Sequence, residues 1–193
     1  MRIKEFDTDK IVDAAMQVFW LRGYAGTSIQ DLVEGTGLSR SSLYNTFENK
    51  YGLYQKALEH YSTITSANVE LISGEGTAKE LIRKLLSSIA EDELSDSLMR
   101  GCMVANASLE LAGHDTTIAE LVLYNLKRLQ KALEKRIQAG QLAGEISKEK
   151  NASALAYFFV NTIQGIRIMG KGCPVQERQR CLHDVINIAL ETL

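Results

Sequence analysis

Five hydrophilic residues lie close together in the sequence near residue 40, and their side chains suit contact with a nucleic acid. They are Arg40, Ser41, Ser42, Tyr44 and Asn45. At helical spacing Leu43 and Phe47, four residues apart, share one apolar face and leave the polar residues on the other. Arginine can donate two hydrogen bonds to guanine O6 and N7, and tyrosine hydroxyl and amide groups suit phosphate oxygens. The pattern predicts a short helix that buries one face and presents the other to a DNA major groove.

Residues 27–50 must position this helix, and they read as two short helices joined by a tight turn. Thr27 is expected to cap the first helix, with Gln30 completing a capping box. Gly35 and Gly37 are expected to end the first helix, because glycine tolerates the left-handed backbone that closes a helix. Ser39 is expected to cap the second helix. The arrangement predicts a helix-turn-helix; the alternative is an ordinary pair of packed helices with a solvated polar face.

The residues around this segment resemble the TetR family of bacterial transcriptional regulators. The resemblance covers residues 8–58, and beyond them it rests on length and helical layout. It is carried by Ala14-Ala15, Phe19, Gly23-Tyr24, Thr27-Ser28-Ile29, Gly37-Leu38-Ser39, Leu43-Tyr44, Phe47, Lys50 and Leu53. It implies a dimeric DNA-binding protein that reads an inverted-repeat operator in double-stranded DNA.

The resemblance also implies which residues touch DNA. Residues at the start of the second short helix are expected to contact base edges, and residues around that helix are expected to contact phosphates. The implied set is Thr27 and Ser28 on phosphate, Ser39 at the helix start, Arg40, Ser41 and Ser42 on base edges, and Tyr44, Asn45 and Lys50 on phosphate. Ser41, Asn45 and Thr46 replace a glycine, a histidine and a tyrosine that are common in the family, so the operator sequence does not follow from the resemblance.

Composition favours an all-α fold. The chain has 193 residues, 45% of them hydrophobic, and a single proline, Pro174, so long helices are permitted nearly everywhere. About nine helices are expected. Residues 1–50 form the helix-turn-helix domain, and residues 51–193 form a helical ligand-binding and dimerisation domain that begins with a linking helix from Lys50 past Tyr61. Capping boxes are expected at Thr77 with Glu80 and at Thr117 with Glu120.

Charge, cysteine content and hydropathy limit the other possibilities. The net charge is −2, and residues 1–56 are neutral, so DNA affinity must come from a few well-placed contacts. Three cysteines without paired spacing indicate a reducing compartment. The N-terminal ten residues have no apolar signal core, and residues 152–168 are too short and too polar to span a bilayer. We expect a cytoplasmic protein with no membrane partner, no cofactor and no metal.

By resemblance, the C-terminal part encloses a pocket for a small-molecule inducer. Its expected lining is Met103, Asn106, Glu110, Tyr124, Phe158, Phe159, Asn161 and Gln164. For each of these residues the alternative is an ordinary core or helix-contact role. Cys102 is expected to follow Arg100 at the start of a helix, where a thiolate is stabilised and reacts more readily. Some TetR-like regulators sense reactive species through cysteine, so a reactive species is a second kind of inducer; the alternative is a buried structural thiol.

The last two helices are expected to pair with their copies in a homodimer. The expected interface comprises Phe159, Leu182, Val185, Ile186, Ala189 and Leu190, an apolar series at helical spacing.

These observations predict a one-component transcriptional repressor and no enzyme. His60, His114 and His183 lie in unrelated segments, and no nucleotide-binding or metal-binding motif is present. The alternatives are a transcriptional activator and a helical protein–protein adaptor that does not bind DNA.

Overall fold

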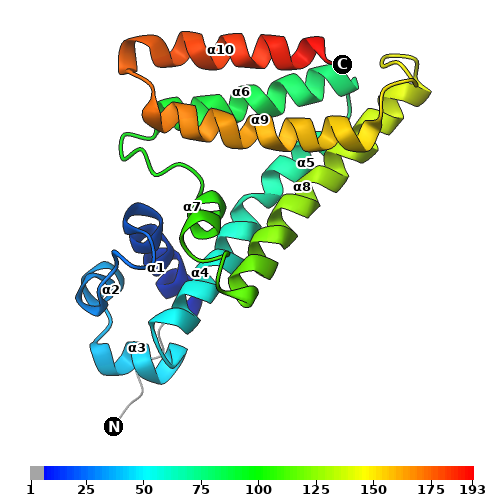
Figure 1. Cartoon of the computed structure of the whole chain (residues 1–193). Helices are drawn as coiled ribbons and strands as arrows, with labels where there is room; N and C mark the ends of the chain where they lie inside the picture. Colours follow the sequence, from blue (N-terminus) through cyan, green and yellow to red (C-terminus); the bar gives the residue numbers. More distant parts are fainter. Residues whose placement is uncertain (1–6) are drawn as a thin grey trace. The chain divides into compact units, whose positions relative to one another are not determined.

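The structure confirms the all-α prediction. It is a computed structural model that describes residues 7–193; the first six residues of the N-terminal segment discussed above lie outside it. Within that range the chain forms ten α-helices and no strand (Figure 1). They are α1 Thr8–Arg22, α2 Ile29–Thr36, α3 Arg40–Phe47, α4 Lys50–Ile64, α5 Ser66–Ser73, α6 Ala78–Ser95, α7 Met103–Glu110, α8 Thr116–Leu142, α9 Ala152–Gly172 and α10 Val175–Glu191.

The structure has one helix more than expected because the linking helix is split in two. It begins at Lys50 as expected, but it is interrupted at Thr65, so α4 and α5 replace one long helix. The residues before the break are Ser62, Thr63 and Ile64. The Thr63 hydroxyl donates to the His60 carbonyl at 2.7 Å. Hydroxyl and β-branched side chains weaken a helix in this way, because they compete for backbone groups and lose rotamer freedom.

Two of the three predicted capping boxes are misplaced. The box of Thr77 and Glu80 opens α6 as predicted. The box at α2 consists of Ser28 and Asp31, one residue later than predicted, because the Thr27 hydroxyl instead donates to the Gly23 carbonyl at 2.6 Å.

The long helix α8 also begins differently from the prediction. It starts at Thr116, and the preceding Asp115 accepts the backbone N–H of Ile118 at 3.0 Å. A carboxylate at this position satisfies an otherwise unpaired N–H group and favours the helix dipole. The expected Thr117–Glu120 box is therefore wrong.

The chain divides into two compact units. Unit 1 comprises the described residues up to Ile64 together with Met103–Val122, and unit 2 comprises Thr65–Cys102 and Leu123–Leu193. This partition differs from the expected boundary at residue 50, because α4 packs against α1 and α7 joins the same unit. Leu53, Tyr54, Ala57, Leu58 and Tyr61 are the buried side chains of α4.

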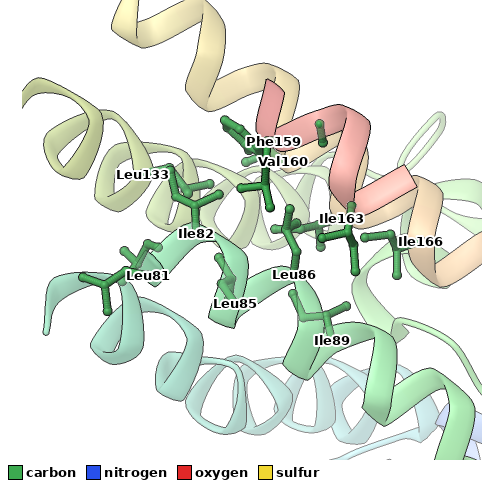
Figure 2. Close-up of a cluster of buried hydrophobic side chains, with 14 of the residues drawn as sticks. Leu81, Ile82, Leu85, Leu86, Ile89, Leu133, Phe159, Val160, Ile163 and Ile166 are labelled. Carbon is green, nitrogen blue, oxygen red and sulfur yellow. The ribbon is translucent and has the colours of Figure 1, made fainter. Parts of the chain in front are cut away.

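Unit 2 is built on α6, α9 and α10, each of which packs against the other two. Figure 2 shows Ile82 and Leu86 of α6 gathered with Val160 and Ile163 of α9. All four are buried. Burial of this kind contributes about 1.5–3 kcal/mol per large aliphatic side chain, so this core holds the unit together.

A buried ion pair joins α6 and α9 in unit 2. Arg167 Nη1 donates to Glu93 Oε1 at 3.2 Å, and both side chains are at most 10% exposed. A Cβ atom at Gly170 would lie 2.7 Å from the Cβ of Glu93, so only glycine admits this approach. Burial raises the pKa of the Glu93 carboxyl, and the neighbouring Arg167 guanidinium offsets part of that rise.

The residues expected at a dimer interface belong mainly to this core. Val185 packs against it while half-buried, and the other five are at most 4% exposed: Phe159, Leu182, Ile186, Ala189 and Leu190. The apolar stripe of α10 faces α6 and α9 of its own chain. These five side chains are therefore unavailable to a second copy, and the interface assignment is corrected for them.

Membrane-spanning character is absent from the described part of the chain. No helix within residues 7–193 combines the length and hydropathy required to cross a bilayer.

Candidate nucleic-acid interface

The helix pair α2 and α3 forms the predicted helix-turn-helix in unit 1. Leu32 of α2 and both Leu43 and Phe47 of α3 are buried. Gly37 ends α2 with φ of 70°, a left-handed conformation that glycine adopts without strain. Ser39 then caps α3 and accepts the backbone N–H of Ser42 at 3.2 Å, as predicted. Local sequence thus fixes both the turn and the start of the second helix.

The free face of α3 is polar and reaches solvent. Arg40, Ser41, Tyr44 and Asn45 are exposed and Ser42 is half-buried. The Arg40 guanidinium carbon lies 5.8 Å from the centre of the Tyr44 ring, a distance typical of a cation–π contact. The face therefore presents one guanidinium and several hydroxyl and amide groups with little bulk, as a major-groove helix requires.

The N-terminus of α2 holds a carboxylate. Asp31 accepts the backbone N–H of Ser28 at 2.8 Å and the Ser28 hydroxyl at 2.7 Å. The Ser28 hydrogen bonds, together with Arg22 at 3.2 Å, lower the pKa of the Asp31 carboxyl. Thr27 is buried with its hydroxyl bonded to a backbone carbonyl. The expected phosphate contact is therefore not available through the Thr27 side chain in this conformation.

Lys50 turns toward the protein. Its ammonium donates to the Thr27 carbonyl at 2.6 Å and lies 4.4 Å from the centre of the Tyr24 ring. These contacts tie the start of α4 to the start of α2. An ammonium group has three N–H donors, so two remain beyond the Thr27 bond. A phosphate contact for Lys50 stays a prediction.

An aromatic cluster lies in the same unit as the helix pair. The ring of Tyr54 lies 5.0 Å from Phe19 and 4.9 Å from Tyr24, and Tyr51 lies 6.2 Å from Tyr24, measured between centroids. Such contacts contribute about 0.5–1.5 kcal/mol each beyond area burial. The cluster joins α1, the turn after it, and α4.

Two carboxylates from a distant segment complete unit 1. Glu110, the last residue of α7, accepts the backbone N–H groups of Tyr24 and Ala25. Asp115 accepts the Tyr51 hydroxyl at 3.0 Å, and this bond, after the backbone N–H of Ile118, lowers the pKa of the Asp115 carboxyl. Both contacts bridge more than sixty residues of chain. No local pattern in the sequence could have indicated them.

The residues expected to line an inducer pocket are distributed over both units. Met103, Asn106 and Glu110 belong to unit 1, and the remaining members belong to unit 2. Met103 is buried, and Glu110 has the backbone partners just described. The inducer role of this group stays a prediction.

Within unit 2 most of the expected pocket residues are exposed. Tyr124 is 59% exposed and Phe158 39%, and Asn161 is also exposed, whereas Phe159 lies in the core. Gln164 has a buried side-chain oxygen that accepts no hydrogen bond from any residue the structure describes.

Cys102 directly precedes α7, close to the predicted position. The side chain is 7% exposed. The adjacent Arg100 guanidinium pairs with Asp96 at 3.2 Å. Burial and this existing pairing weaken the reasons for expecting a reactive thiolate, and sensing through Cys102 stays a prediction.

Catalytic and metal-binding arrangements were not expected. No group of three or more His, Cys, Asp or Glu side chains within the described residues could hold a metal ion.

Comparison with known families gives two matches. Residues 11–57 match a model described as "Bacterial regulatory proteins, tetR family". Residues 77–176 match a model described as "Tetracyclin repressor-like, C-terminal domain". The first match contains α2, α3 and most of α1 and α4.

Curated relatives match over most of their length. The chain is 31% identical over 172 residues to the HTH-type transcriptional repressor ComR of Escherichia coli (strain K12), covering 88% of this chain and 82% of ComR. It is 29% identical over 194 aligned positions to an uncharacterized HTH-type transcriptional regulator, YezE of Bacillus subtilis (strain 168), covering 100% of this chain and 98% of YezE.

A solved structure with DNA is also similar. A cysteine mutant of the TetR family transcriptional regulator CifR, complexed with 26-bp double-strand operator DNA, matches with a TM-score of 0.83 and 26% identity. The match covers 96% of this chain and 98% of that one. A Bacillus subtilis regulator, FadR, in complex with stearoyl-CoA shares the fold with a TM-score of 0.73 and 19% identity, covering 97% of this chain and 100% of FadR.

Proposed function

Because this chain belongs to the TetR family of bacterial transcriptional regulators, we propose that it is a one-component repressor that binds an inverted-repeat operator as a homodimer and leaves it when a small molecule binds. The observation that carries this proposal is the face of α3. Arg40, Ser41, Tyr44 and Asn45 are exposed, whereas Leu43 and Phe47 on the opposite face are buried. A helix anchored in this way can enter a groove without exposing apolar surface.

Base reading falls to the first turn of α3. Arg40 is the residue suited to a guanine, since its guanidinium can donate to O6 and N7 together. Ser41 and Ser42 lie beside it and can donate to or accept from a base edge or a bridging water. Tyr44 and Asn45, one turn further along, suit phosphate oxygens.

The start of α2 supplies a second phosphate contact. Ser28 is exposed at the N-cap of α2, where the helix dipole favours an anion. The Asp31 carboxylate already occupies part of this position. Ser28 therefore contributes less to phosphate binding than Tyr44 and Asn45.

The second copy sits on the outward faces of α9 and α10. Their inward faces form the core of unit 2, yet large apolar side chains also remain outside. Tyr157 and Ile168 on α9 and Ile188 on α10 are 56–63% exposed. Exposed apolar side chains on neighbouring helices favour association, and a twofold dimer would duplicate every DNA contact.

The signal enters through unit 2. Stearoyl-CoA is the molecule bound in the FadR structure, and the cysteine substitutions belong to the CifR structure. For this chain we retain a small organic molecule, or a reactive species acting on Cys102, as the inducer, and the cytoplasm as the site of action.

Selection of DNA by the intact protein tests the proposal. Wild-type protein is incubated with a library of randomised DNA duplexes, and the bound fraction is sequenced. A recovered inverted repeat, and a reporter promoter carrying it that the protein turns down in cells, support the proposal. Recovery of no common sequence overturns DNA reading by α3, and a promoter that the protein turns up instead overturns repression and indicates activation.

A further inference from the structure

The turn between α1 and α2 is a short stretch of backbone whose N–H groups need partners. Gly23 closes α1 with φ of 73°, and its own N–H donates to Phe19. The next two N–H groups, of Tyr24 and Ala25, continue neither helix. Tyr24 is half-buried, so its N–H needs an acceptor, whereas the N–H of the exposed Ala25 can also bond to water.

Glu110 supplies both acceptors from α7. Its Oε2 accepts the Tyr24 N–H at 2.8 Å, and its Oε1 accepts the Ala25 N–H at 2.5 Å. Each carboxylate oxygen therefore holds one of two consecutive backbone donors. Hydrogen bonds to a charged acceptor are roughly twice as strong as neutral ones. The contact lies entirely within unit 1.

The fit around this carboxylate is close. A Cβ atom at position 23 would lie 3.0 Å from Glu110 Oε2, so a larger residue than glycine would press on the carboxylate. The turn is also linked onward, since the Gly23 carbonyl accepts the Thr27 hydroxyl and the Thr27 carbonyl accepts the Lys50 ammonium. The position of the turn therefore fixes the start of α2, and α2 leads directly into α3.

We propose that Glu110 is a positioning residue for operator binding: its carboxylate holds the α1–α2 turn, and thereby the helix pair α2–α3, in the arrangement that reads DNA. Glu110 itself does not touch DNA. This inference rests on the operator binding proposed above. It assigns Glu110 to the DNA-binding unit in place of the inducer pocket expected from the sequence.

A positioning role separates specific from non-specific binding. Reading bases requires α3 in one orientation, whereas non-specific attraction to phosphates tolerates a displaced helix. Loss of the Glu110 contact should therefore weaken binding to the operator and leave binding to unrelated DNA nearly unchanged. A loss of folded protein would instead weaken both in the same proportion.

The test compares Glu110→Gln with Glu120→Gln. Glutamine keeps the length of the side chain but replaces one accepting oxygen by an NH₂ group, which opposes a backbone N–H. Glu120 is an exposed glutamate of the same unit, so its variant matches the charge change. Both variants and the wild type are titrated, at one salt concentration, against the duplex that the wild type selects and against a scrambled duplex.

We expect Glu110→Gln to lower operator affinity by about tenfold per protomer, hence about a hundredfold for a dimer, and to change affinity for the scrambled duplex by less than about twofold. Glu120→Gln should match the wild type on both duplexes. Equal operator affinity for the two variants, or a parallel loss on both duplexes, overturns the proposal. A wild type that selects no duplex refutes the proposed function itself, which keeps the two failures distinct.

Amide hydrogen exchange on the wild type gives an independent measurement that does not depend on a variant folding. The N–H groups of Tyr24 and Ala25 should exchange slowly although Ala25 is exposed at the surface. Exchange of both at the rate of an unprotected amide overturns the proposal. If Glu110→Gln does not fold, Glu110→Asp, which withdraws the carboxylate by one methylene, is titrated against the same duplexes with the same expected results.

Discussion

Replacing Arg40 by alanine should change which base pair the protein prefers. Arg40 is the exposed guanidinium at the start of α3. A bidentate contact to guanine contributes about 1–3 kcal/mol of discrimination per base, or about 2–6 kcal/mol when a dimer makes it in both half-sites. In the free protein the guanidinium lies 5.8 Å from the Tyr44 ring centre, and leaving that ring costs about 0.5–1 kcal/mol per protomer. The net loss at mid-range values is therefore about 2.5 kcal/mol, which is roughly seventyfold in affinity, within bounds of about 0 and 5 kcal/mol.

The assay is a set of anisotropy titrations on a panel of duplexes. Each duplex carries one base-pair change, made symmetrically in both half-sites of the selected operator. Arg83→Ala serves as the matched control, because Arg83 is an exposed arginine of α6 in unit 2 and its removal changes the net charge equally. Arg40→Ala should bind the whole panel more evenly at one symmetric position and retain the wild-type preferences at the others.

Two results would refute this reasoning. One is a loss of affinity by the same factor on every duplex, which would make Arg40 a phosphate contact. The other is a binding profile for Arg40→Ala that matches Arg83→Ala, which would place Arg40 outside the interface.

Three further substitutions test the packing within the two units. Glu93→Ala removes the carboxylate that pairs with the buried Arg167 guanidinium and should lower the free energy of unfolding by about 3–5 kcal/mol, whereas methionine at both positions should be close to neutral in urea titrations. Ser28→Ala removes the side chain that caps α2 and should lower the free energy of unfolding by about 1 kcal/mol. The pKa of the Asp31 carboxyl is lowered from 3.8, so its contribution to the stability of the folded protein is present above pH 3.8 and is lost as the pH falls through the lowered pKa. Ser28→Ala should therefore make the free energy of unfolding less dependent on pH in this acidic range. Gly35→Ala should destabilise the protein by about 1–3 kcal/mol in thermal melts, because its Cβ would lie 2.4 Å from a side chain of α1.

Each of these has a result that contradicts it. A double methionine variant as unstable as Glu93→Ala would show that the ion pair itself stabilises the unit and that apolar packing does not replace it. If the free energy of unfolding of Ser28→Ala depends on acidic pH as the wild type's does, the Ser28 hydroxyl is not what lowers the pKa of Asp31. Gly113 has open space where a Cβ would lie, so Gly113→Ala is the control for Gly35→Ala, and equal melting of the two would disprove the clash.

The interface helix could be predicted because its determinants are local. Leu43 and Phe47 lie one turn apart and are both buried, and the Ser39 hydroxyl sits where a capping residue must. The start of α2 was harder, since two adjacent pairs fit the capping pattern. Thr27 with Gln30 and Ser28 with Asp31 are both permitted by spacing. The choice depends on where the Thr27 hydroxyl finds its acceptor, which spacing does not reveal.

Distant contacts were beyond prediction for a different reason. An apolar stripe such as that of α10 requires a partner, but sequence cannot tell whether the partner is another helix of the same chain or a second copy. Leu182, Ile186 and Leu190 are buried against their own chain. The contact of Glu110 could not be predicted either, because its carboxylate oxygens accept backbone N–H groups that precede it by more than eighty residues.

The central claim is that the exposed face of α3 enters the major groove at two symmetric places, and methylation interference tests it most directly. The selected duplex is methylated lightly at guanine N7, which lies in the major groove, and at adenine N3, which lies in the minor groove, before bound and free fractions are separated. We expect guanine methylation to block binding at two symmetric positions about 34–36 Å apart along the helix axis, or somewhat more if the DNA is deformed. Interference confined to adenine N3, or the absence of paired guanine positions, would contradict the account.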